Sequence, residues 1–188
     1  NSMSDLFHKD VPTAFIQRVV TTMQNTPQHQ FQVLTKRYDR PFQALYPQDA
    51  SDNILIGFSI CNQADADQAR DYLRFVSRDG WRTFVSYEPA LGAINWQGFE
   101  FIEWLICGGE SGPHARPMNP DWARSARDFC ATNRIPFFFK QWGEWAPCID
   151  RDTGEQRGDM VKLGKKASGH ILDGETHLEY PPLQYDRQ

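Results

Sequence analysis

The sequence predicts an α/β protein with parallel strands, arranged as a partial, TIM-like (β/α) barrel. Short apolar runs alternate with helical patterns along the chain, which is typical of right-handed βαβ units. The runs are almost continuously apolar, as in strands that are covered on both faces. Each run also ends in a polar cluster. In a barrel all such clusters converge on one mouth, whereas in an open doubly wound sheet only those beside a switch point do so. The barrel is therefore favoured over the open sheet.

Five strands and three helices account for this alternation. The strands are expected at residues 30–34, 53–59, 82–86, 101–107 and 135–139. The helices are expected at residues 13–23, 64–78 and 120–132. Asn119 is a good N-cap for the last helix, and Pro120 suits its first turn. Residues 42–46 are either a short helix or a turn, and residues 92–98 are a loop.

The length predicts an incomplete barrel. An eight-stranded barrel takes about 250 residues, and this chain has 188. Residues 1–8 look like a polar loop that follows a strand, although no strand precedes them. We therefore expect the chain to begin inside the fold, with at least one βα unit absent. Residues 1–147 are assigned to the partial barrel. Residues 148–188 are assigned to a C-terminal extension, a hairpin or lid, that packs on the barrel and is not an independent domain.

The charge pattern narrows the expected partners. The net charge is −4, and no Lys/Arg cluster indicates nucleic acid or an anionic membrane. No apolar run is long enough to span a membrane and no signal peptide is visible, so a cytoplasmic location is expected. The partner is expected to be a small molecule or a nucleotide. Nucleic acid stays possible, although the charge does not indicate it.

The four cysteines are Cys61, Cys107, Cys130 and Cys148, and no two of them have C-x-x-C spacing. That spacing is typical of zinc and iron–sulfur sites, so neither a metal site nor a cofactor is expected in this chain. Reduced, buried thiols are favoured over disulfides. Missing strands would leave a sheet edge exposed, which predicts a homodimer or an ordered covering segment.

Four residues near strand ends are candidates for catalysis. Glu88 precedes a proline, which restricts its backbone and would aim its carboxylate as a general base. Glu110 follows two glycines, and Lys140 lies just past an apolar strand, where it would be partly desolvated. Asp5 would act with His8 if the loop folds them together. For each of them, the alternative is an ordinary solvated or turn residue.

The candidate ligand-binding residues flank the same strand ends. Lys36 and Arg37 suit a phosphate or a carboxylate, the arginine through a bidentate fork. Adjacent glycines allow a ligand to approach the backbone closely. Trp142 would supply a stacking wall, unless it caps the barrel core. The full set is Lys36, Arg37, Gly108, Gly109, Ser111, Arg116, Gln141 and Trp142.

Six groups of residues carry a family resemblance. They are NSMSDLFH from Asn1, QVLTKR from Gln32, EP and LG from Glu88, GGESGP and ARPM from Gly108, FFFKQWGEW from Phe137, and GKKA and LDG from Gly164. In this order and spacing they resemble an uncharacterised family of phage and prophage proteins, catalogued after phage gene products 37 and 68. The resemblance extends over nearly the whole chain.

That family is similar to radical-SAM enzymes. Its members usually begin with a strand and a three-cysteine loop, which would hold a [4Fe–4S] cluster that binds S-adenosylmethionine. Here that segment is missing, so the resemblance implies both cofactors only if the segment is restored, and it implies that this chain alone is inactive. The residues implied to line the mouth beside the Gly-Gly-Glu string are Asp5, Lys36, Arg37, Glu88, Arg116, Lys140 and Gln141.

Three functions follow as hypotheses. The leading one is a phage-associated fragment of a radical-SAM-like barrel with an unknown substrate. The second is a cofactor-independent hydrolase or lyase, with Glu88 or Glu110 as the base and Lys36 or Lys140 stabilising an oxyanion. The third is a non-enzymatic module that binds a nucleotide or nucleic acid.

Overall fold

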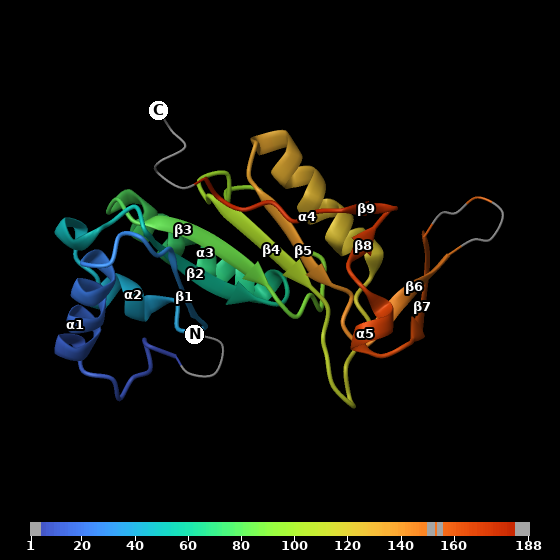
Figure 1. The fold of residues 1–188 in the computed structure, drawn as a ribbon, viewed down its shortest axis with the longest axis horizontal. Helices are drawn as coiled ribbons and strands as arrows, with labels where there is room; N and C mark the ends of the chain where they lie inside the picture. The colour runs from blue at the N-terminus through green and yellow to red at the C-terminus, as the bar shows by residue number, and fades with distance from the viewer. Residues whose placement is uncertain (1–4, 150–152, 154–155, 183–188) are drawn as a thin grey trace.

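The computed structural model describes residues 5–149, 153 and 156–182. They form an α/β fold around one five-stranded sheet (Figure 1). The strands pair in chain order and all run parallel. They are β1 (Phe31–Thr35), β2 (Ile54–Ile60), β3 (Arg82–Tyr87), β4 (Trp104–Gly108) and β5 (Phe137–Gln141). The α/β class and the parallel sheet are as predicted.

The sheet is open. Strands β1 and β5 are its two edges, so the described residues do not form a closed barrel. The order of the strands also differs from a doubly wound sheet, in which the order reverses at a switch point. No reversal occurs among these five strands. Pairing in chain order leaves the carboxyl ends of all five strands side by side.

Helices connect most of the strands. They are α1 (Thr13–Gln24), α2 (Asp39–Ala44), α3 (Gln63–Arg78) and α4 (Pro120–Asn133), with a short 3-10 turn at Pro47–Asp49. Helix α4 begins as predicted, since the side chain of Asn119 accepts a hydrogen bond from the backbone N–H of Asp121. The segment between β3 and β4 contains no helix, and Trp96 fills this layer by stacking on Phe129 of α4.

The two faces of the sheet are packed differently. Because side chains alternate along a strand, Ile56, Val85 and Phe139 point to one face. There they join the apolar sides of α1, α3 and α4 in a large core. The other face, which we call the second face, carries a smaller cluster. It consists of Leu55, Phe84 and Trp104, with Leu34, Ile106 and Phe138 packed against them.

The last described residues cover the β5 edge and part of the second face. The N–H of Phe139 donates to the carbonyl of His177 (2.7 Å), and the N–H of Glu179 donates to the carbonyl of Phe137 (3.1 Å). The ring of Tyr180 then packs on Phe138, with 5.1 Å between the ring centroids. One sheet edge therefore has the covering segment that the sequence left as an alternative to a dimer. Among the described residues, β1 pairs with β2 alone.

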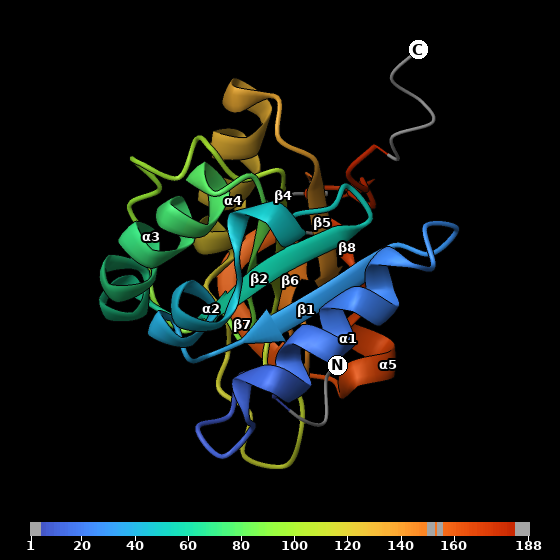
Figure 2. The same cartoon turned by 90° about the vertical axis from the view of Figure 1, so that its left-hand side faces the viewer.

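The C-terminal region contains an antiparallel hairpin, β6 (Trp145–Ile149) with β7 (Gln156–Lys162). It is followed by α5 (Lys165–Ser168), β8 (Ile171–Leu172) and β9 (Glu175–Thr176), and Figure 2 gives a second view of this arrangement. Strand β6 crosses the boundary expected at residue 147/148. Residues 1–4, 150–152, 154–155 and 183–188, which include parts of the expected loop and extension, lie outside the described residues. None of the helices described here is long and apolar enough to cross a membrane.

Candidate functional site

The carboxyl ends of the five strands contribute one residue each to the second face. The alternation of side chains that puts Leu55, Phe84 and Trp104 on this face also directs to it the residues that lie an even number of positions further along each strand. We call this set the polar row. It consists of Lys36, Cys61, Glu88, Gly108 and Lys140.

Glu88 and Lys140 form an ion pair in the polar row. The Nζ of Lys140 lies 2.8 Å from Oε2 of Glu88. The Lys140 side chain is 52% exposed, since it lies beyond the end of the apolar run and keeps contact with solvent. Glu88 is only 18% exposed, and its Oε1 is buried with no hydrogen-bond partner among the described residues. A buried acceptor without a partner costs free energy, so this oxygen marks a place where a donor is missing.

Gly108 makes room for this pair. A Cβ atom at residue 108 would lie 3.3 Å from Cγ and Cδ of Glu88. Because β4 lies between β3 and β5, a side chain at this position would stand between the two charged groups. The glycine therefore allows Glu88 and Lys140 to meet across the middle strand.

Glu110 is held by Arg116. The carboxylate accepts from Nε (2.9 Å) and from NH2 (2.7 Å) of the guanidinium, and also from the backbone N–H of Arg116 (2.8 Å). These hydrogen bonds lower the pKa of Glu110 to about 2. A carboxylate with such a pKa is a weak base near neutral pH. The arrangement suits Glu110 to fixing the loop after β4 and not to the catalytic role that its position suggested.

Cys61 directly follows β2 and lies near charged side chains of both signs. The pKa of its thiol is raised, chiefly by burial and further by Asp65. The positive charges of Lys36 and Arg116 act in the opposite direction. Lys36 and Arg116 are therefore both within electrostatic range of Cys61. The sequence did not single out Cys61 as a site residue, although its position directly after a strand was the available signal.

The loops after β4 and β5 cross at very close range. A Cβ atom at Gly109 would lie 1.9 Å from the carbonyl oxygen of Trp142. The Trp142 side chain is only 2% exposed, and its indole N–H donates to the carbonyl of Ile171 (2.8 Å). Trp142 therefore lies in the core, and the predicted stacking wall is wrong. Gln141 remains near the surface and donates from Nε2 to Oγ of Ser111 (3.1 Å).

Asp5 anchors the first described loop to the end of β1. Its Oδ2 accepts from Oγ1 of Thr35 (3.0 Å) and from NH1 of Arg37 (3.4 Å). His8 has a different side-chain partner, since its Nδ1 accepts from the backbone N–H of Asp10 (3.3 Å). The expected pairing of the Asp5 and His8 side chains is thus not formed. Asp5 and Arg37 neutralise each other at the rim of the site.

Comparison with known proteins gives a family. The family model described as "Protein of unknown function (DUF5131)" matches residues 1–181. The chain belongs to the DUF5131 family. No curated protein and no solved structure matches it. Since the family description names no activity, the function of this DUF5131 protein has to be argued from its site.

The DUF5131 chain brings most of the predicted site residues to one edge of the sheet. Lys36, Glu88 and Lys140 belong to the polar row, and Glu110 with Arg116 lies in the loop beside it. Within the described part of the chain, no group of three or more His, Cys, Asp or Glu residues could hold a metal ion. The edge thus combines several cations with the carboxylates of Glu88 and Glu110.

Proposed function

We propose that this DUF5131 protein has the fold of a radical-SAM-like partial (β/α) barrel, and that its polar row binds a small anionic molecule or a nucleotide. Pairing of parallel strands in chain order supports the barrel ancestry, because (β/α) barrels are built in this way. The six sequence strings support the link to the phage and prophage family. In such folds the carboxyl ends of the strands carry the site.

The observation that carries the proposal is the unpartnered Oε1 of Glu88. This oxygen is buried beside Gly108 while Oε2 binds Lys140. A ligand with an N–H or O–H group would supply the missing hydrogen bond, which a charged acceptor makes about twice as strong as a neutral one.

The surrounding charges favour an anionic group on the same ligand. Lys36 is exposed and Lys140 is half exposed, while Arg116 is 62% exposed and shares its charge with Glu110. These side chains suit phosphate or carboxylate recognition. A nucleotide or an amino-acid-like molecule carries both a hydrogen-bond donor and an anionic group.

The iron–sulfur cluster that the resemblance implies does not fit the described residues. Cys107 and Cys130 are buried in the core. Among the described residues, Cys61 does not belong to a group of side chains that could hold a metal ion. No step of the proposed function is therefore routed through a cluster in this chain.

A second candidate is a cofactor-independent hydrolase or lyase. It is favoured by the contact between Glu88 and Lys140, which puts a carboxylate base 2.8 Å from a cation that can stabilise developing negative charge. Glu88 fits this role better than Glu110, whose carboxylate is occupied by Arg116.

Calorimetric titration with S-adenosylmethionine and with ATP tests the proposal. The variants are Glu88→Gln and Lys140→Met, which remove one charge each from the polar row. The matched controls are Asp71→Asn and Arg78→Met, which remove the same charges from exposed positions on α3. We expect at least one of the two compounds to bind, with a dissociation constant about tenfold higher in either polar-row variant and unchanged in the controls.

Two results would overturn it. One is the absence of saturable binding for both compounds, and the other is equal affinity in the wild type and Glu88→Gln. Turnover of p-nitrophenyl acetate without a cofactor, lost in Glu88→Gln, would establish the hydrolase candidate instead. Binding without turnover that weakens steeply with salt would indicate the nucleotide or nucleic-acid binding module.

A further inference from the structure

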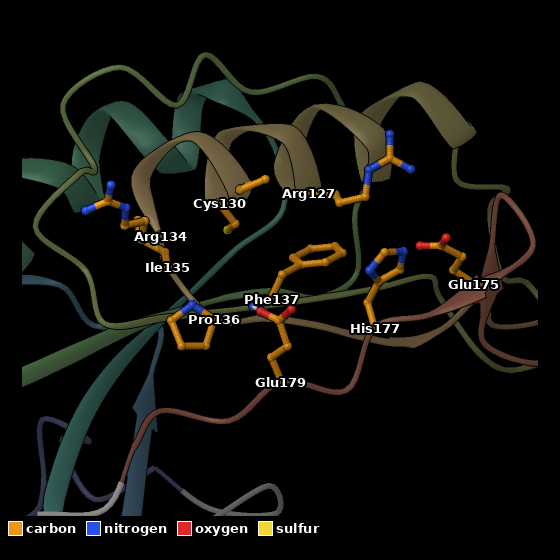
Figure 3. A pocket seen from close by; sticks show the side chains of 10 residues that line it. Arg127, Cys130, Arg134, Ile135, Pro136, Phe137, Glu175, His177 and Glu179 are labelled. Atoms are coloured by element: carbon orange, nitrogen blue, oxygen red, sulfur yellow. Dashed lines mark hydrogen bonds between the residues drawn. The ribbon is translucent and has the colours of Figure 1, made fainter. Parts of the chain in front are cut away.

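A separate cavity lies between α4, β5 and the segment that covers the β5 edge (Figure 3). Its volume is about 510 Å³, which is within the range of small-molecule sites. No residue of the polar row lines it. Ile135, Pro136 and Phe137 form its apolar part, and its polar groups come from the segment 175–179 on one side and α4 on the other.

Two carboxylates face this cavity. Glu179 accepts from the backbone N–H of Phe137 through Oε2 (3.0 Å), and its charge adds to the effect of burial in raising the pKa of the Cys130 thiol on α4. Glu175 points toward His177 (Figure 3), and among the described residues its carboxylate makes no hydrogen bond or ion pair. The two carboxylates therefore lie on either side of His177 along the segment that covers β5.

The cations of the cavity do not balance these carboxylates. Arg127 is engaged by Asp128 (2.8 Å) and Asp173 (2.7 Å). Arg134 lies at the opposite end of the cavity, next to Ile135 (Figure 3). The electrostatic balance near Phe137 thus favours a cation.

His177 provides a second, independent indication that the cavity binds a ligand. Its Nε2 is buried and has no hydrogen-bond partner among the described residues. The imidazole stands edge-on to the ring of Phe137, with 5.7 Å between the centroids. The ring of Phe137 and an unsatisfied imidazole nitrogen therefore lie on the same side of the cavity as the two carboxylates.

We propose that this cavity binds an organic ammonium ion with a flat apolar body. The carboxylate of Glu175 binds the ammonium group, and one N–H of that group donates to Nε2 of His177. The charge of Glu179, on the other side of His177, adds to the negative potential of the cavity. The body of the ligand packs against Phe137 and Ile135, where a cation beside an aromatic ring gains further stabilisation. This site is independent of the polar row and of the function proposed for it.

Amide NMR titration with benzylammonium chloride tests the proposal. Benzyl alcohol and sodium benzoate serve as the neutral and anionic probes of the same size. We expect saturable shifts at residues 131–137 and 175–179 with benzylammonium, and an affinity about tenfold lower for the alcohol. Glu175→Gln and Glu179→Gln should each weaken benzylammonium binding, whereas Asp71→Asn on the outer surface should not. Gln at position 179 retains an acceptor for the N–H of Phe137, and a dispersed spectrum checks that each variant is folded.

Three outcomes would overturn it. The first is equal affinity for benzylammonium and benzyl alcohol, which would mean an apolar pocket without charge selection. The second is stronger binding of benzoate, which would mean that the arginines of the cavity select an anion. The third is unchanged benzylammonium affinity in both glutamine variants.

Discussion

Glu88 and Lys140 make a 2.8 Å ion pair although they extend from β3 and β5, two strands that are not neighbours. The strand between them contributes Gly108, and a Cβ there would crowd the Glu88 side chain at 3.3 Å. The first glycine of the Gly-Gly-Glu string is thus explained by the ion pair that crosses it. Among the residues that the structure describes, the same geometry leaves Oε1 of Glu88 without a hydrogen-bond partner, which gives the edge its capacity to bind a donor.

Replacing Lys140 with Met should change stability only slightly. Lys140 is half exposed, and ion pairs of this kind contribute about 0–1 kcal/mol because water screens them. We expect urea unfolding of Lys140→Met to give a free energy of unfolding within about 1 kcal/mol of the wild type. A loss of several kcal/mol would instead identify the pair as a structural element and would weaken the case for a binding role.

The two adjacent glycines of the string should respond differently to alanine. A methyl group at Gly109 would lie 1.9 Å from the Trp142 carbonyl oxygen, which is backbone and cannot move aside alone. Gly109→Ala should therefore lower the free energy of unfolding by about 3 kcal/mol or more. Gly108→Ala meets only the flexible Glu88 side chain and should cost about 1 kcal/mol or less. Equal losses in urea unfolding would contradict the close crossing of the two loops.

Gly112→Ala provides the control for backbone conformation in the same loop. Gly112 has φ of +115°, and a Cβ there would meet no atom within 4 Å. Its replacement should cost about 1 kcal/mol through backbone strain alone. The loss at Gly109 should exceed this value, because the Gly109 substitution creates a steric clash.

The pH dependence of stability should report the contact between Glu110 and Arg116. The folded-state pKa of Glu110, about 2, is below the ordinary value of 4.5. The contact therefore contributes fully above about pH 4.5 and is lost as the pH falls toward 2. Carboxyl ¹³C NMR should give a Glu110 midpoint near 2 in the wild type and a higher midpoint in Arg116→Ala, which removes the guanidinium and keeps the backbone N–H of residue 116. An unchanged midpoint in that variant would show that another group lowers the pKa.

The sheet was predictable from the sequence because buried parallel strands read as continuous apolar runs. The expected strand at residues 53–59 is found at Ile54–Ile60, and the one at residues 82–86 at Arg82–Tyr87. The largest error concerns residues 101–107, where the strand begins only at Trp104. Phe101 and Ile102 are apolar because they pack in the core from a loop, and composition alone does not separate these two situations.

The site was predictable as a set of strand ends but not as a set of contacts. The polar clusters after the strands indicated Glu88 and Lys140, yet nothing in the sequence paired them across Gly108. Trp142 was misplaced because its aromatic side chain suits a core and a binding wall equally, and its contact with Ile171 comes from a distant segment. The sequence left open an ordered segment that covers a sheet edge, but it did not assign this role to residues 177–180, because their hydrogen bonds to β5 depend on tertiary structure.

The free edge at β1 leads to the last prediction, a homodimer formed through this strand. The N–H of Phe31 donates to the carbonyl of Asn53 (2.7 Å), so the backbone N–H of residue 31 points toward β2. In a parallel strand the next residue, Gln32, then directs its N–H away from β2, and its side chain is exposed. An edge strand with outward-pointing backbone groups can form hydrogen bonds with a strand of another molecule.

Sedimentation velocity over a range of protein concentrations tests this dimer. We expect the wild type to dimerise and Gln32→Pro to stay monomeric, because proline removes the outward N–H while leaving the hydrogen bonds toward β2 in place. Gln32→Ala keeps the N–H and should dimerise like the wild type. A wild type that stays monomeric at every concentration would contradict the prediction, as would equal loss of dimer in both variants. The contrast between proline and alanine attributes the association to the backbone of β1 and not to the glutamine side chain.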